Sequence, residues 1–307
     1  MPPPPSPATN AESSAQLSLD NVRQTLLRLE ETLIFGFIER AQFCHNAVVY
    51  RVGAFPELAP EASLCGYLLH ETERTHALMR RYTSPDEHPF YHDLPPPRLA
   101  PLRYAENPLA PNTVNFNARI LNDYTSVIIP RLCPPGDDRQ YGSSVVCDIP
   151  LLQAASRRIH YGKFVAESKY RQTPAAFDPL IAAGDTDGLF AAITHVDVEQ
   201  QVIARVAEKS TTFLSALRRQ GASRIPSVSC LTDIYREWII PLNKAVQVEY
   251  LLARAPLPRQ PPQRRGQNPA VTEDFQFRGR VDPAADPDAV LTPIRFGGAQ
   301  IQLHSRR

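Results

Sequence analysis

The stretch DIPLLQAASRRIHYGKFVAESKY, residues 148–170, decides the fold of this chain. Its alanines and leucines favour an α-helix, and Pro150 suits a first helical turn, where the missing N–H would have no partner anyway. At about 100° per residue, Arg158, Gly162 and Lys169 fall on one face, which Val165 shares. The two cations then stand about 16 Å apart along the helix axis.

Two environments can be weighed for this helix. A solvated helix with scattered basic residues is the common case, because charged side chains mostly sit in water. This stretch is apolar on several sides, however, which is typical of a buried helix, and buried cations need anionic partners or ligands. The pattern therefore favours a small-anion site inside a helical protein, with the glycine leaving room for something to approach.

The same stretch resembles the long active-site helix of the fungal, all-helical chorismate mutases. The match covers roughly residues 17–254, with six blocks in collinear order: NVRQTLLRLEETLIFGFIER, MRRYTSPDEHPFY, YGSS, SRRIHYGKFVAESKY, ITHVDVEQQV and IYREWIIPLNKAVQVEYLLAR. Six blocks in one order are far more specific than any single motif. The resemblance implies a homodimeric, yeast-type multi-helix bundle in the cytoplasm. It also implies the conversion of chorismate to prephenate for phenylalanine and tyrosine biosynthesis.

Length and composition argue against several classes of protein. The 307 residues can bury a substantial core, and the net charge of +1 gives no sign of a nucleic-acid or membrane partner. The five cysteines form no CxxC pair, which indicates reduced thiols in an intracellular protein. The sequence contains no run of about 18 apolar residues, which is the length that a membrane-spanning helix needs. The first sixteen residues lack the features of a secretory signal.

Apolar periodicity predicts an all-α fold, since nothing alternates convincingly with a period of two. A proline-dense loop is expected over 88–117, and a kink at Pro241. Residues 1–16 and 255–307 lack periodic apolar positions and are predicted to be disordered, so the folded domain spans 17–254. The helices are expected over residues 19–41, 62–82, 118–132, 148–170, 177–189, 193–217 and 229–254.

The resemblance implies a role for each matching residue. Arg23 and Arg158 correspond to arginines that clamp the substrate carboxylates, and Lys169 to a donor for the ether oxygen and a carboxylate. Glu199 corresponds to the acceptor for the ring hydroxyl. Asn243 stands where the family often has threonine and is expected to donate to a carboxylate. From pattern alone, Arg23 also suits a rim position, and Glu199 the start of a helix.

Two positions depart from the family in ways that affect the pH dependence. Gln247 stands where several fungal enzymes have glutamate facing the ether oxygen. A glutamine amide donates without being protonated, so we expect a rate that varies little across the neutral range. His195 stands at a position that is usually asparagine. It suits a surface histidine at a helix start, but in the pocket it would contact substrate and could restore pH dependence.

The implied reaction needs neither metal nor cofactor. It is a one-substrate pericyclic rearrangement, so the enzyme must hold a reactive conformer and stabilise charge that develops on the ether oxygen. The chain contains no competing nucleophile motif such as G-x-S-x-G.

Fungal members of the family bind tyrosine as inhibitor and tryptophan as activator at a dimer interface. Val146, Arg139 and Gln140 depart from that site, so we expect effector binding with altered strength or selectivity. The arginine pair also suits a helix C-terminus, where cations complement the helix dipole. The residues that match the effector site or its switch are Arg80, Arg81, Gly142, Ser143 and Ser227.

Three other functions are less well supported by the sequence. A non-catalytic relative would bind chorismate or an amino acid without turnover, but the matching cations are all present. A secreted relative would need a signal that the sequence lacks. A nucleic-acid-binding bundle is poorly supported by the balanced charge.

Overall fold

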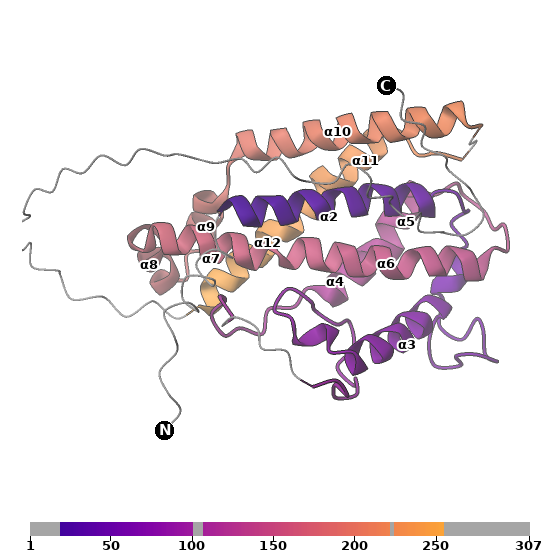
Figure 1. Cartoon of the computed structure of the whole chain (residues 1–307), viewed down its shortest axis with the longest axis horizontal. Helices are drawn as coiled ribbons and strands as arrows, with labels where there is room; N and C mark the ends of the chain where they lie inside the picture. Colours follow the sequence, from indigo (N-terminus) through magenta and orange to yellow (C-terminus); the bar gives the residue numbers. More distant parts are fainter. Residues whose placement is uncertain (1–18, 101–106, 222–223, 255–307) are drawn as a thin grey trace, which may run out of the picture. The chain divides into compact units, whose positions relative to one another are not determined.

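The computed structural model describes residues 19–100, 107–221 and 224–254, and Figure 1 shows their arrangement. Within these ranges the chain forms helices and connecting segments and no β-strand, which confirms the all-α prediction. The terminal segments 1–16 and 255–307, predicted to be disordered, lie outside the described residues.

The predicted helices are present with shifted ends, and residues 177–189 belong to two helices rather than one interrupted helix. Short 3₁₀ turns cover Ala47–Tyr50 and Arg81–Thr83. The α-helices are α2 Leu19–Arg40, α3 Leu64–Leu78, α4 Asn117–Asp123, α5 Ile129–Leu132, α6 Tyr141–His160, α7 Gly162–Gln172, α8 Pro174–Ala183, α9 Thr186–Ile193, α10 Val196–Arg219, α11 Val228–Ile234 and α12 Ile240–Ala253.

Two helices contain a π-helical turn shortly before a proline. Tyr124–Ile128 and Tyr235–Ile239 are π-helical, and the sequence Ile-Pro follows each of them. Proline offers no N–H, and its ring clashes with the carbonyl four residues earlier. A wider turn relieves both constraints without ending the helix. The disturbance predicted at Pro241 therefore takes the form of a π-turn.

The central helix begins earlier than the sequence suggested. It starts at Tyr141 and contains Pro150 in its interior, so the prediction that Pro150 lies in the first turn was wrong. The proline leaves the carbonyl of Val146 without its usual N–H partner. Val146 is exposed, so water can reach that carbonyl. A turn at Tyr161 then separates α6 from α7, where one helix was expected.

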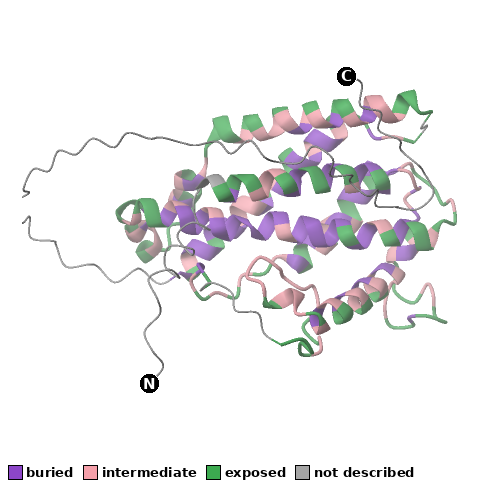
Figure 2. Cartoon of the chain, viewed as in Figure 1, coloured by how far each residue is buried: buried purple, intermediate pink, exposed green. Residues whose placement is uncertain are grey.

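The α6–α7 run forms the centre of the helical domain. Figure 2 shows most of its length as buried, with α2 alongside it. Helices α2 and α3 pack on α6, while α12 packs on α7, α6 and α9. Apolar residues of α2 that recur at helical spacing form a buried stripe, which includes Val22, Leu29, Leu33 and Phe37.

A buried ion pair joins α2 to α6. Arg40 Nε donates to Asp148 Oδ1 at 2.7 Å, and both side chains are fully buried. The hydroxyls of Tyr50 and Tyr124 donate to the same carboxylate, each at 2.7 Å. Burial raises the pKa of Asp148, although Arg40 and the two tyrosines act in the opposite direction. These four side chains fix the register of α2 against α6.

The proline-dense segment before α4 is attached to the bundle through its backbone. The Glu73 carboxylate accepts the N–H groups of Phe90 and Tyr91. His160 Nε2 accepts the N–H of Phe116 at 2.8 Å. The described parts of the predicted loop are therefore held against α3 and α6 at Phe90, Tyr91 and Phe116.

Candidate active site

A cavity of about 130 Å³ lies where side chains from α2, α6, α7, α9, α10 and α12 converge. Its lining is Leu26, Arg158, Val165, Lys169, Ile193, His195, Val198, Glu199, Val202, Ile240, Asn243, Lys244 and Gln247. It gathers most of the residues that the sequence singled out as catalytic or substrate-binding. Helix periodicity brings Arg158, Val165 and Lys169 to the cavity from one face of α6–α7, as predicted.

Arg158 is the most deeply buried cation of this cavity. Only 6% of the residue is exposed, and its Nε has no hydrogen-bond partner among the described residues. The nearby carboxylate of Glu30 is engaged by Arg205 at 3.3 Å and by Lys209 at 3.3 Å. Burial lowers the pKa of Arg158, while Tyr235 and Glu30 raise it. An arginine nevertheless keeps its charge in a protein, so this guanidinium favours an anionic ligand.

Lys169 and Lys244 supply further positive charge. Lys169 Nζ donates to the carbonyl of Ile193 at 2.6 Å. Burial lowers the pKa of Lys169 to about 8, against the opposing effect of Glu199. Lys244 Nζ lies 2.9 Å from Glu199 Oε1 and 4.2 Å from the centre of the Phe190 ring.

An amide pair on α12 completes the polar lining. Gln247 Nε2 donates to Asn243 Oδ1 at 2.9 Å. Asn243 Nδ2 donates in turn to the carbonyls of Arg158 and Ile159, at 3.3 and 3.0 Å. Gln247 is 4% exposed, and its Oε1 has no partner among the described residues. A ligand with both donor and acceptor groups would match this cavity.

Two predicted substrate contacts take different positions. His195 lines the cavity from the N-cap of α10. Arg23 is exposed on α2 and is absent from the lining, although Leu26, three residues later, belongs to it. Residues three apart lie on the same side of a helix, so Arg23 stands about one turn N-terminal of Leu26 on α2. The structure therefore places Arg23 beside the cavity and does not bring it into the lining.

The predicted effector residues form separate groups within one chain. Arg80 donates to the carbonyl of Ala100, and Arg81 Nη1 donates to Gln153 Oε1 at 2.8 Å. Gly142 and Ser143 lie in the first turn of α6. That turn is about 16 Å along the helix from Gln153. The two groups therefore lie at separate places within one chain.

Ser227, the remaining predicted effector residue, has a local structural role. It caps α11 by accepting the N–H of Cys230 at 3.0 Å.

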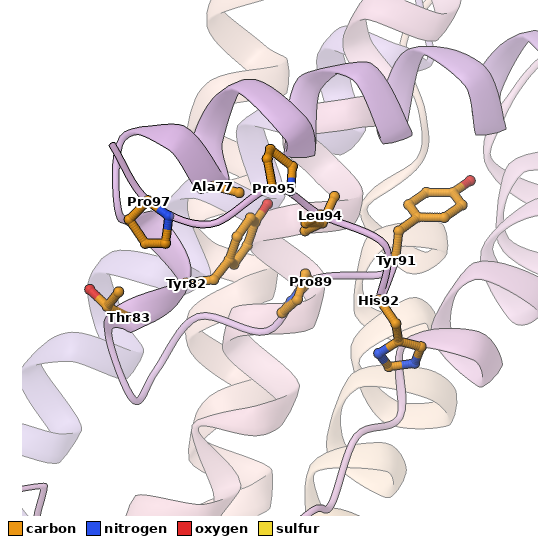
Figure 3. A pocket seen from close by; sticks show the side chains of 9 residues that line it. All are labelled: Ala77, Tyr82, Thr83, Pro89, Tyr91, His92, Leu94, Pro95 and Pro97. Atoms are coloured by element: carbon orange, nitrogen blue, oxygen red, sulfur yellow. The ribbon is translucent and has the colours of Figure 1, made fainter. Parts of the chain in front are cut away.

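Other cavities lack a comparable set of charges. Figure 3 shows one of about 260 Å³ whose labelled lining is mainly proline and aromatic, including Tyr82 and Tyr91. Another, of about 780 Å³, includes Arg157, but that guanidinium is paired with Asp86 at 2.6 Å. Although both are larger, we assign the chemistry to the cavity at Arg158, because charge and not volume distinguishes it.

The described residues contain neither a metal-binding cluster nor a membrane-spanning helix. No cluster of three or more histidine, cysteine, aspartate or glutamate side chains in the described ranges is arranged to hold a metal ion. In the same ranges no helix has the length and apolar character needed to cross a bilayer. The five cysteines are free thiols.

Sequence reasoning missed Lys244 and the apolar walls of the cavity. Lys244 follows Asn243 directly, so its place between two predicted site residues on one helix was an available signal. Leu26, Val202 and Ile240 resemble ordinary core positions in a periodic pattern. Nothing in the sequence distinguishes such a wall from the interior.

Comparison with known proteins gives a consistent result. The family model described as "Chorismate mutase type II" matches residues 141–248. A chorismate mutase from Schizosaccharomyces pombe is 45% identical over 245 residues, covering 78% of this chain and 97% of the relative.

Two solved structures are similar over more than three quarters of the chain. The Candida albicans chorismate mutase in complex with L-Trp has a TM-score of 0.73 and 35% identity, covering 78% of this chain and 92% of that one. AtCM1 with tyrosine bound in the allosteric site has a TM-score of 0.70 and 41% identity, covering 77% and 96%.

Proposed function

The chain belongs to the chorismate mutase family, and we propose that it converts chorismate to prephenate in the cavity at Arg158. Chorismate carries two carboxylates, an enol ether and a ring hydroxyl. Its rearrangement needs no nucleophile and no proton transfer, so the protein contributes by positioning and by electrostatic stabilisation. The observation that carries this assignment is the buried guanidinium of Arg158, whose Nε has no hydrogen-bond partner within the part of the chain that the structure describes.

Most of the residues that the sequence named have a matching part of the substrate. Arg158 holds one carboxylate through its planar fork of donors. Lys169 donates toward the ether oxygen and a carboxylate, and Glu199 accepts from the ring hydroxyl. Gln247 supplies an N–H toward the ether oxygen. Arg23 closes on the substrate from the adjoining turn of α2, which requires its long side chain to turn toward the cavity.

Replacing Arg158 tests this function. Arg158→Ala should lower kcat/KM for chorismate by about three decades, because it removes a clamp that also holds the transition state. The assay follows ultraviolet loss of chorismate and formation of prephenate. Arg157→Ala is the matched control, since Arg157 pairs with Asp86 and Glu87 away from the cavity. A purified wild-type protein that binds chorismate without converting it would favour a binding relative instead.

Assembly and regulation follow from the same family membership. We propose a cytoplasmic homodimer in which Arg80 and Arg81 of one copy face Gly142 and Ser143 of the other. The separation of these groups within one chain supports a shared site. Similarity to structures that hold L-Trp, or tyrosine in an allosteric site, supports an amino-acid effector. Val146 is exposed on α6 near this turn and carries no hydrogen-bonding group, so we expect altered selectivity.

A further inference from the structure

Asn243 was expected to contact a substrate carboxylate, but the structure uses its amide elsewhere. Its two N–H groups face two backbone acceptors, the carbonyls of Arg158 and Ile159. The last four carbonyls of a helix have no intrahelical partner, and α6 ends at His160. Asn243 therefore adds a side-chain donor to two carbonyls at the C-terminal end of α6, and one of them, that of Ile159, also accepts the Tyr161 N–H.

Close packing of two helices makes this contact possible. A Cβ atom on Gly162 would lie 2.6 Å from the carbonyl oxygen of Asn243 and 3.0 Å from its Nδ2. Any other residue at 162 would push α12 away from α7. From the sequence, the space beside Gly162 was expected to be open to an approaching group. In the structure Asn243 fills that space.

The orientation of Asn243 determines the orientation of Gln247. Because the NH₂ group of Asn243 must face the two carbonyls, its Oδ1 faces the next turn of α12. Gln247 must then present its own NH₂ group to that oxygen, at 2.9 Å. This assignment rests on the backbone carbonyls, which cannot donate, and not on an arbitrary choice of amide rotamer. One N–H of Gln247 is held, while the other and the buried Oε1 remain for the cavity.

We propose that Asn243 is a positioning residue that orients the Gln247 amide and does not itself bind substrate. This inference rests on the proposed function, because the task of Gln247 is to donate to the ether oxygen as charge develops there. A group that orients a transition-state donor affects kcat, whereas a direct carboxylate contact also changes KM. Its effect should disappear once the oriented donor is removed.

A double-mutant cycle tests the proposal. Gln247→Met removes the donor at similar volume and should lower kcat about 100-fold. Asn243→Ala should lower kcat about 10-fold with KM changed less than about twofold. In the Gln247→Met background, the same replacement should lower kcat by less than about twofold. If the fold-decrease in kcat of the double variant equals the product of the two single decreases, the proposal is overturned. It is also overturned if Asn243→Ala raises KM and leaves kcat unchanged.

Controls separate misfolding from mispositioning. Asn243→Ser keeps a hydroxyl donor for a carbonyl but is too short to hold Gln247, so it should fold and reproduce the loss in kcat. A Ser variant with wild-type kcat would overturn the proposal. Asn122→Ala, on the exposed side of α4, should leave both kinetic constants unchanged. Circular dichroism and thermal melting of each variant verify the fold.

A further readout does not depend on turnover. In protein labelled with ¹⁵N-glutamine, the Gln247 side-chain signals are identified by their loss in Gln247→Met. One amide proton should exchange slowly with solvent in the wild type and rapidly in Asn243→Ala. Equal exchange in both proteins would contradict the orientation. If the wild type fails to convert chorismate while this difference is observed, the proposed function fails and the positioning remains.

Discussion

At the scale of single residues, Arg158 and Lys163 are both buried cations, yet they differ in what surrounds them. Lys163 is 3% exposed, and its Nζ lies 2.8 Å from His88 Nε2 and 2.5 Å from the Val114 carbonyl oxygen. Burial lowers the pKa of Lys163 to about 8. A lysine can lose its proton or use neutral acceptors, whereas an arginine cannot be neutralised. The Arg158 guanidinium, whose Nε lacks a partner among the residues described, is therefore the stronger indication of a ligand.

The alkaline limb of the activity profile should follow Lys169. Its pKa is lowered to about 8, so the charged form is lost as the pH rises through that value. Because the proposed site needs the cation, kcat/KM should be nearly flat in the neutral range and fall about tenfold per pH unit well above pH 8. Initial rates from pH 6 to 10 measure this profile.

Lys169→Arg separates this lysine from other titrating groups. Arginine stays protonated throughout the tested range, so any activity that the variant retains should show no alkaline fall. The same fall in the arginine variant would assign the titration to a different residue.

At the scale of elements, the contact between α2 and α6 depends on Asp148. Asp148→Ala would leave the fully buried Arg40 without its anion and two tyrosine hydroxyls without their acceptor. Breaking such a pair costs about 3–5 kcal/mol of the free energy of unfolding, which urea titration would measure. Asp123→Ala, which removes a more exposed i,i+4 pair with Arg119, should cost less than about 0.5 kcal/mol. Equal losses would contradict this account.

At the scale of the whole molecule, regulation should depend on two copies of the chain. Tyrosine should lower the rate of chorismate conversion and tryptophan should raise it, because the proposed dimer would bring the separated effector groups of two copies together. Rates measured over a wide range of effector concentrations, together with sedimentation of the protein, test this. Identical rates with and without both amino acids would contradict it, and so would a monomer that responds.

Local sequence determined much of this protein. Helix periodicity fixed the buried stripe of α2 and the shared face of Arg158, Val165 and Lys169, since both follow from 3.6 residues per turn. The resemblance also named residues that the structure then gathered around one cavity. The roles of those residues remain predictions, and so does the predicted end of the folded domain at residue 254.

Only the tertiary structure decided how the site is completed. The start of α6 at Tyr141, the turn at Tyr161 and the engagement of Asn243 could not be read from local pattern. Each depends on contacts between distant segments; Asn243 and Ile159, for example, lie 84 residues apart. Periodicity specifies which face a side chain occupies. Which group meets that face is set by the packing of another helix, and here that packing made Gly162 a contact for Asn243 rather than an opening for substrate.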